Sequence, residues 1–156
     1  MDRDAWKLIG ICGIYCGDCP SYLAQQIDDP GELDKRAEEM GLRPEEVRCS
    51  GCHSDQVMVT CVECKAGFRD CAREHGVRWC FQCPDFPCRR LEDFKDVHVE
   101  NGISHHEHLI AELTYLRDKG TEAWLKKKDR EGRCPRCRQR VYWSTRACPA
   151  CGTQIR

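Results

Sequence analysis

The chain has 156 residues, of which 40% are hydrophobic and 33% are charged, and its formal net charge is −1 at pH 7. No apolar run approaches the ~20 residues that a membrane-spanning helix needs, so we exclude an integral membrane protein of that kind and expect no membrane partner. The 15 cysteines leave two broad classes, a disulfide-stapled scaffold or a metal protein.

Short helices are predicted along the first half of the chain. Residues 20–29 predict one helix, and a second begins at Asp29-Pro30, because proline is tolerated in the first helical turn. Gly41 ends that helix. The stretch 56–60, with apolar residues at 57–59, is the best strand candidate, and we expect it to form one arm of a hairpin between two metal knuckles.

Further helices are predicted in the second half. Residues 68–75 predict a helix, and another opens near Pro87. The clearest amphipathic helix spans residues 107–119, where leucines recur at helical spacing, and Gly120 closes it. Thr121 can cap a helix that follows.

These elements predict a small α+β metal-stabilised domain with zinc knuckles, short helices and little sheet, joined to a C-terminal zinc-ribbon β-hairpin. We place a cysteine-rich metal-binding domain at residues 1–97, a helical connector at 98–131 and the ribbon at 132–156. Apart from cysteine the apolar content is modest, so we expect metal to supply much of the folding free energy. Structural zinc can contribute on the order of 10 kcal/mol.

The cysteine pattern favours metal over disulfides. The chain begins with charged residues and no apolar segment follows them, so we expect no secretory signal peptide and a cytoplasmic location. An odd number of cysteines cannot all pair, and most lie in C-x-x-C pairs, which suit a metal knuckle better than a structural disulfide. Thiols in a reducing cytoplasm stay available as ligands.

The strongest motif is C-terminal, with C-P-R-C and C-P-A-C separated by ten residues. Two such knuckles can close one tetrahedral zinc site through four cysteines, Cys134, Cys137, Cys148 and Cys151. Four protein ligands leave zinc no open position, so we expect a structural role. Residues 141–143 are predicted to form a strand of the ribbon hairpin.

Charge divides the chain unevenly. Residues 1–125 carry 15 Lys and Arg against 24 Asp and Glu, whereas residues 126–156 carry 10 against 2. Arginines beside Tyr142 and Trp143 could hold phosphates and stack on bases. We therefore expect residues 126–156 to meet nucleic acid or an acidic protein surface, including the protein's own body, and a plain solvated face is the alternative. The sequence identifies no small-molecule substrate.

The remaining cysteines are all candidate metal ligands, namely Cys12, Cys16, Cys19, Cys49, Cys52, Cys61, Cys64, Cys71, Cys80, Cys83 and Cys88. One division gives a four-thiolate zinc site from Cys49, Cys52, Cys61 and Cys64 and another from Cys71, Cys80, Cys83 and Cys88. The first cluster then lacks a fourth ligand, which a histidine such as His53 or His75 could supply. Pairing across the clusters is equally open.

The first cluster, Cys12-x3-Cys16-x2-Cys19, also suits a 4Fe–4S cluster, because three thiolates can hold three of its irons. Its spacing resembles that of radical S-adenosylmethionine enzymes, but the chain is far too short for their usual barrel. No Ser/His/Asp set, glycine-rich phosphate loop or carboxylate pair stands out, so we lean away from an enzyme. We expect His105, His106 and His108 to be exposed or capping residues rather than ligands.

The body carries four cysteine motifs in order, which are C-G-I-Y-C-G-D-C-P-S-Y, C-S-G-C, C-V-E-C with D-C-A-R-E-H-G-V, and W-C-F-Q-C-P-D-F-P-C. With these motifs residues 10–97 resemble the domain of unknown function 3795 family. The resemblance implies a cytoplasmic metal-binding protein and assigns no reaction. Some members look similar further on, where G-x-E-x-W-L leads into a terminal zinc ribbon. The chain departs from the family pattern at residues 68–70, where an aliphatic and two basic residues are more usual.

We therefore expect an uncharacterised multi-zinc-binding protein that acts as a non-catalytic binding or adapter module and presents its basic ribbon to an anionic partner. It would hold several zinc ions, at least one of them in the ribbon. The alternative is an iron–sulfur redox carrier or sensor with a 4Fe–4S cluster in the N-terminal domain. A third interpretation is an enzyme whose incomplete first site keeps an open zinc position.

Overall fold

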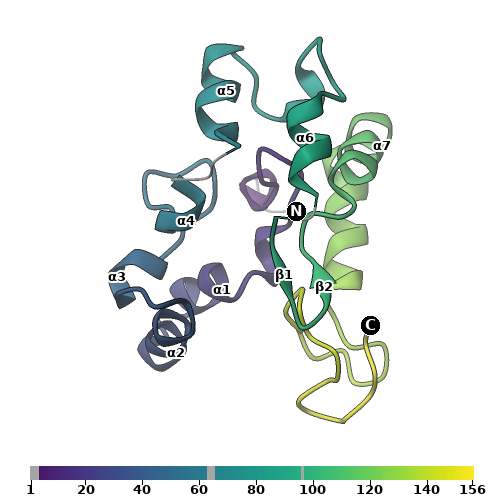
Figure 1. Cartoon of the computed structure of the whole chain (residues 1–156). Coiled ribbons are helices and arrows are strands. Elements are labelled where there is room, and N and C mark those ends of the chain that lie inside the picture. Colours follow the sequence, from purple (N-terminus) through teal and green to yellow (C-terminus); the bar gives the residue numbers. More distant parts are fainter. Residues whose placement is uncertain (1–3, 63–65, 96) are drawn as a thin grey trace.

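The structure is a computed structural model that describes residues 4–62, 66–95 and 97–156. It is α-rich with one short two-stranded sheet, as predicted at this level. Figure 1 shows α1 to α5 on one side of the N-terminal loop (residues 9–15), α6 and α7 on the other, and the C-terminal module (residues 132–156) below. In chain order the elements are η1 (Ala5–Leu8), η2 (Cys16–Asp18), α1 (Pro20–Gln26), α2 (Pro30–Met40), α3 (Pro44–Val47), α4 (Val59–Val62), α5 (Phe68–Glu74), η3 (Cys80–Gln82), α6 (Arg89–Phe94), β1 (Val99–Glu100), β2 (Ile103–Ser104) and α7 (Leu109–Glu131).

Helices α1 and α2 form where capping signals predict them. The Asp29 side chain accepts the backbone N–H of Glu32 at 3.1 Å, and Pro30 occupies the first turn of α2. Leu33 and Ala37 then lie on the buried face of α2 and pack with α1 and α3. This small apolar cluster holds the three helices together.

Helix α7 bends back on itself at Gly120, which has φ 80° and ψ 170°, outside helical values. The predicted closure there is confirmed, and a second helical stretch follows. Because the chain turns, Lys127 Nζ from the second stretch lies 2.6 Å from Glu112 Oε1 of the first. Trp124 is fully buried, so the second stretch is anchored in the body.

Apolar burial within the described residues falls into four clusters rather than one core. The two largest flank the N-terminal loop: Ile11 belongs to one with Leu113, and Ile9 belongs to the other with Trp124. The loop that carries the first cysteines is therefore fixed on both sides by side chains of α7.

The strand predicted at residues 56–60 is wrong, because α4 begins at Val59. The Ser50 N–H donates to the Gln56 carbonyl at 2.8 Å and so closes a loop around Cys52. These residues close a cysteine loop instead of pairing with a strand of the described chain. The helix expected near Pro87 begins slightly later, at Arg89.

A hairpin at residues 99–104 was not predicted. Val99 pairs with Ser104 and Glu100 with Ile103, and the turn is Asn101-Gly102, both with positive φ. Asn-Gly is the preferred sequence for a two-residue hairpin turn, so the signal was present. The segment between the body and α7 thus begins with a hairpin. Residues 141–143 form no strand, and Arg140 makes only an isolated bridge with Arg133.

The C-terminal module binds the loop between Cys16 and Cys19. The Trp143 N–H donates to the Asp18 carbonyl at 3.2 Å, and Arg140 Nη1 donates to the Gly17 carbonyl at 2.9 Å. From the hairpin, Asn101 Nδ2 donates to the Ser144 carbonyl at 3.2 Å. Hydrogen bonds therefore connect the module to the hairpin and to the loop between Cys16 and Cys19, which we call the first cysteine loop.

Three histidine rings pack at this junction. His105 stacks on Trp143 with ring centroids 4.1 Å apart, and His98 meets the same indole at 5.0 Å. His106 is buried against Phe94, which corrects the expectation that it would be exposed or capping, whereas His108 is exposed. Burial, reinforced by neighbouring histidines, lowers the pKa of His105, and burial lowers that of His106 to about 4.

Stability should fall in mild acid because of these histidines. A histidine whose pKa is depressed on folding binds its proton more readily when unfolded, so its stabilisation is present above about pH 6.5 and is lost toward the folded pKa. His106→Phe removes this titration and the buried Nδ1 that lacks a partner. As the pH is lowered from about 7.5 to about 5, we expect the melting temperature of wild type to fall further than that of His106→Phe. The difference should be about 2–4 °C for each kcal/mol of stability that the histidine loses.

The matched control is His108→Gln, which removes an exposed imidazole from the same segment and should follow the wild-type pH profile. Metal release in acid affects all three proteins alike, so the comparison cancels it. A constant difference between His106→Phe and wild type across this range would contradict the assignment.

Candidate metal centres

The C-terminal module brings Cys134, Cys137, Cys148 and Cys151 together, with all four sulfur atoms within 4.8 Å of one another. The Sγ atoms of Cys134 and Cys151 are 3.6 Å apart, and those of Cys137 and Cys148 are 3.5 Å apart. This spacing matches the edges of a tetrahedron of thiolates around one ion, since a Zn–S bond is ~2.3 Å. The tetrad could therefore hold a metal ion through protein ligands alone.

Two turns of the same design present these sulfurs. The Cys134 N–H donates to the Gln139 carbonyl, and the Cys134 carbonyl accepts the Arg138 N–H. The Cys148 turn repeats both bonds with Thr153 and Gly152. Arg138 and Gly152 occupy equivalent places with φ 63° and 71°. Each turn thus directs two sulfurs toward the other turn.

The surroundings of the tetrad favour ionised sulfur on one side. Cys134 and Cys148 are buried, whereas Cys137 is exposed. Hydrogen bonding with Thr153 Oγ1, 3.2 Å away, lowers the pKa of the Cys151 thiol to about 6. Because the thiolate is the form that binds metal, Cys151 is prepared for coordination near neutral pH.

In the body, the structure brings the first cysteine cluster to the second. The hydrogen bond that Cys16 donates to Cys52 lowers the pKa of Cys52, to about 7, and raises that of Cys16. Burial raises the pKa of Cys19 to about 12, and the nearby Cys49 adds to this rise. Cys16 of the first cluster therefore lies beside Cys52 of the second, a juxtaposition that the sequence left open.

The predicted grouping of Cys49, Cys52, Cys61 and Cys64 cannot be followed in full, because Cys64 lies outside the described residues. Cys12 interacts electrostatically with Cys52, Cys80 and Cys61. His53 Nε2 lies 3.0 Å from the Ile9 carbonyl, a bond in which the imidazole donates, so this nitrogen is engaged by backbone.

A second group of candidate ligands in the body lies between α5 and η3. Burial raises the pKa of Cys80 to about 12. The neighbouring thiols Cys71, Cys88 and Cys83 add to this rise. All four cysteines line one small cavity of about 30 Å³, together with His75. This is the predicted set of Cys71, Cys80, Cys83 and Cys88, gathered around a shared space.

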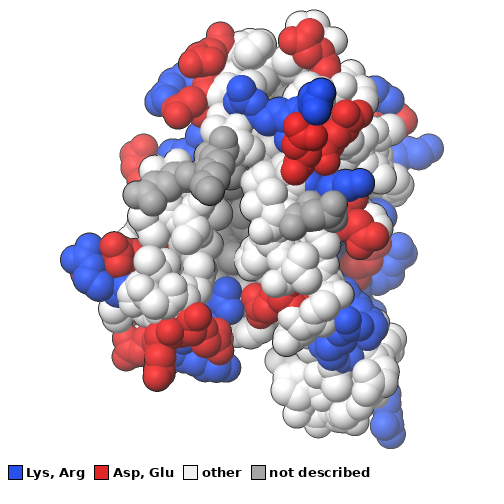
Figure 2. Space-filling model, in the orientation of Figure 1, with Lys and Arg blue, Asp and Glu red and all other residues white. Residues whose placement is uncertain are grey.

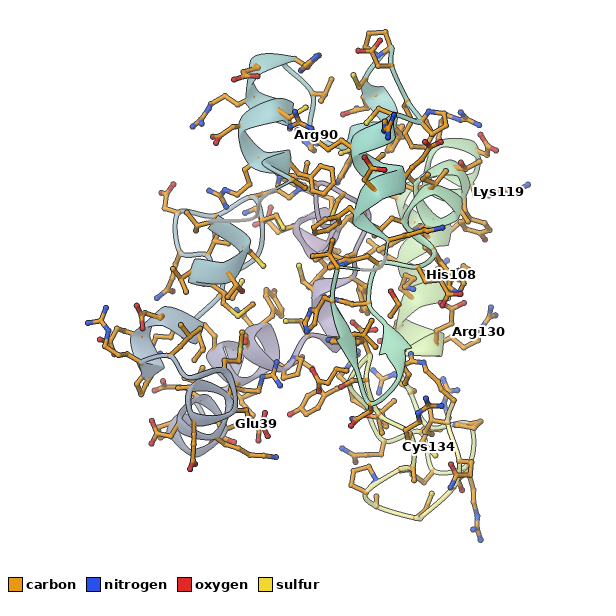
Figure 3. The ribbon with its side chains drawn as sticks, viewed as in Figure 1. Glu39, Arg90, His108, Lys119, Arg130 and Cys134 are labelled. Carbon is orange, nitrogen blue, oxygen red and sulfur yellow. The ribbon has the colours of Figure 1, made fainter. Side chains whose placement is uncertain are left out.

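His75 and Asp85 also lie at this second group, and neither was predicted to belong to it. Ligand atoms of His75, Cys83 and Asp85 lie within 4.8 Å of one another. His75 Nδ1 is 2.8 Å from the Cys71 carbonyl, and a bond donated there leaves Nε2 as the free ring nitrogen. Cys71 and His75 are four residues apart, so they share one face of α5, and that spacing was a readable signal. Figure 3 shows this end of the molecule, marked by Arg90, far from Cys134 in the C-terminal module.

Loss of one tetrad sulfur should cost the protein one metal ion. Cys148→Ser replaces a buried thiolate ligand by a hydroxyl, and three sulfurs hold the ion much more weakly. We expect elemental analysis of the purified protein to show one ion fewer per chain. Ala150→Ser, an exposed change within the same turn, should leave the metal content unaltered. Equal metal content in both variants would show that the tetrad holds no ion.

Comparisons with known proteins agree with the cysteine pattern. Searches of curated proteins and of solved structures found no match. Residues 8–93, more than half of the chain, match the family described as protein of unknown function (DUF3795). The match covers the first cysteine loop, the clusters that follow it and all but the last residue of α6, and it ends before the hairpin and the C-terminal module. The chain therefore belongs to the DUF3795 family.

Proposed function

We propose that this protein is a non-catalytic binding module that holds several zinc ions and presents its C-terminal module to an anionic partner. The observation that carries this proposal is the tetrad of sulfur atoms, all within 4.8 Å of one another. Four thiolates suit zinc and leave it no open position for water or substrate, so a structural role follows from the ligand set. We place the protein in the cytoplasm, where thiols stay reduced and so remain available as metal ligands.

Much of the basic charge in residues 126–156 is used within the protein. Arg133 and Arg140 both pair with Asp129, and Lys127 and Lys128 pair with carboxylates of α7. These contacts support the interpretation that the protein's own acidic groups are one partner of this segment. They also fix where the module sits, because Asp129 and Arg140 join α7 to the module.

Arg136 and Arg138 remain for an outside partner. Both are exposed on the first cysteine turn, and neither pairs with an acidic group of the described residues. Residues 132–156 contain six arginines and no Asp or Glu, so no acidic group within the module offsets them. Figure 2 shows blue side chains on the C-terminal module, with red concentrated elsewhere in this view.

The aromatic residues favour recognition by charge rather than by base stacking. Trp143 is only 5% exposed and stacks on His105, so its indole is not offered to a nucleic-acid base. Binding would therefore depend on arginine contacts with phosphates or carboxylates and would be strongly salt-dependent. A nucleic acid offers the phosphates for such contacts, and an acidic protein segment offers the carboxylates.

Removing the two free arginines should weaken binding to polyanions. We expect the double variant Arg136→Ala/Arg138→Ala to bind an RNA oligonucleotide or poly-L-glutamate less tightly, with the salt dependence of log K reduced by about 2 for two lost phosphate contacts. Fluorescence anisotropy across a salt series measures both quantities.

The control is Arg73→Ala/Arg89→Ala, which removes the same charge from α5 and α6, where each arginine pairs with a nearby Asp. Equal losses for both double variants would show that net charge alone determines binding and would contradict a partner site on the module. Absence of binding by the wild-type protein to either polyanion would contradict the anionic partner.

The crowding of sulfur in the body favours a second candidate function, an iron–sulfur redox carrier or sensor. Cys12 and Cys16 are buried and both interact with Cys52, and Cys19 lies near Cys49. This buried group includes the first cluster, whose three thiolates suit three irons of a 4Fe–4S cluster.

Elemental analysis of protein purified without oxygen separates the two candidates. About four irons per chain, with a broad visible absorbance that Cys16→Ser abolishes, would support the redox protein. About three or four zinc ions without iron would support the zinc-holding module and exclude the cluster. Ser50→Ala, a change beside Cys49 that removes no sulfur, is the matched control for the spectrum.

A further inference from the structure

A cavity of about 170 Å³ lies where the first cysteine loop, the hairpin, α7 and the C-terminal module meet. Its volume is far above the ~10–15 Å³ that one water needs and below the ~300–1,000 Å³ typical of drug-sized ligands. Its polar lining includes side chains from all four segments, namely Asp18, His105, Glu112, Lys128 and Arg156. A small polar metabolite is the size that fits.

Two carboxylates on this cavity have acceptor capacity that the protein does not use. Asp18 is only 5% exposed, and its carboxylate accepts from its own backbone N–H and lies near the charges of Lys128, Arg156 and Arg140. Its two oxygens have further acceptor positions. Glu112 accepts from Lys127 through Oε1, but its Oε2 is buried and without a partner. An unpaired buried acceptor costs free energy, so a ligand that donates to these oxygens would recover it.

Cations line the same cavity. Lys128 Nζ lies 3.6 Å from Glu112 Oε1, and its side chain is only 18% exposed. Arg156 reaches the cavity from the end of the chain, and its guanidinium donates to the carbonyls of Tyr142 and Trp143. The cavity therefore presents carboxylates and cations together within a small volume.

We propose that this cavity binds a small zwitterion of the α-amino acid class. The ligand ammonium would donate to Asp18 and Glu112 Oε2, and its carboxylate would accept from Lys128 and Arg156. A purely anionic ligand would be repelled by the carboxylates, and a purely cationic one by the cations, whereas a ligand with both charges matches both parts of the lining. Apolar surface from Ile14, Leu109 and the Trp143 ring would cover an aliphatic side chain.

Binding at this place would also fasten the module to the body, because the cavity walls come from both. The proposal does not depend on an anionic macromolecule binding the module. Its test leaves the tetrad intact, so metal content reports on the zinc-holding function independently.

Calorimetry on the full-length, metal-loaded protein tests the proposal with L-alanine, L-valine, L-leucine and L-methionine. We expect one site per chain for at least one of them. For L-leucine, the counterpart without the carboxylate is isoamylamine, and the counterpart without the amine is 4-methylpentanoate. We expect each counterpart to bind at least about tenfold more weakly than the amino acid. Absence of binding by all four amino acids, or equal binding of a counterpart, would overturn the proposal.

Variants place the ligand in this cavity. Glu112→Gln and Lys128→Met should each weaken amino acid binding about tenfold or more, because each removes one charge-assisted hydrogen bond. Glu122→Gln and Lys126→Met are the matched controls, since these residues of the same helix pair with each other outside the cavity. Circular dichroism and metal content confirm that each variant is folded. Binding by folded Glu112→Gln and Lys128→Met as tight as that of the controls would overturn the assignment.

Discussion

The contact between the C-terminal module and the Cys16–Cys19 loop is the interaction on which the arrangement of the molecule depends. Arg140 and Trp143 both donate to carbonyls of this loop, so the module holds the backbone between two candidate metal ligands. A side chain or N–H that binds a ligand loop restricts the directions in which its sulfurs can point. The module that carries the tetrad therefore also restrains the loop that carries Cys16 and Cys19.

Apolar packing is extensive in the body, whereas in the C-terminal module cysteines make up much of what is buried. Packing is strongest around the N-terminal loop, where Ile9 and Trp124 are fully buried, and α7 contributes to both large clusters. In the module the buried residues number few, and two of them are tetrad cysteines. A segment this small buries too little apolar surface to fold alone, so its contacts with the body, and any ion that the tetrad holds, contribute to its stability.

Local signals explain what could be predicted from the sequence. Capping at Asp29-Pro30, the break at Gly120 and the tetrad spacing depend on residues close in the chain, and each is seen in the structure. Long-range pairing does not leave such a signal, so the approach of Cys16 to Cys52 could not be read from spacing. The strand predicted at residues 56–60 is wrong for the same reason, because contacts with residues distant in the sequence decide the conformation of so short a stretch. The Asn101-Gly102 turn shows the opposite case, a local signal that was present and was not used.

The two cysteine turns of the module differ at one position, and the difference has a cost. Gly152 adopts its left-handed conformation freely, but Arg138 holds the equivalent conformation with a side chain, at about 1 kcal/mol. Glycine at that place would give the same turn without the penalty. The module therefore gives up some of its own stability to carry a guanidinium there, next to the exposed sulfur of Cys137. Strained backbone is common at functional sites, and here it carries a guanidinium that the turn itself does not need in order to form.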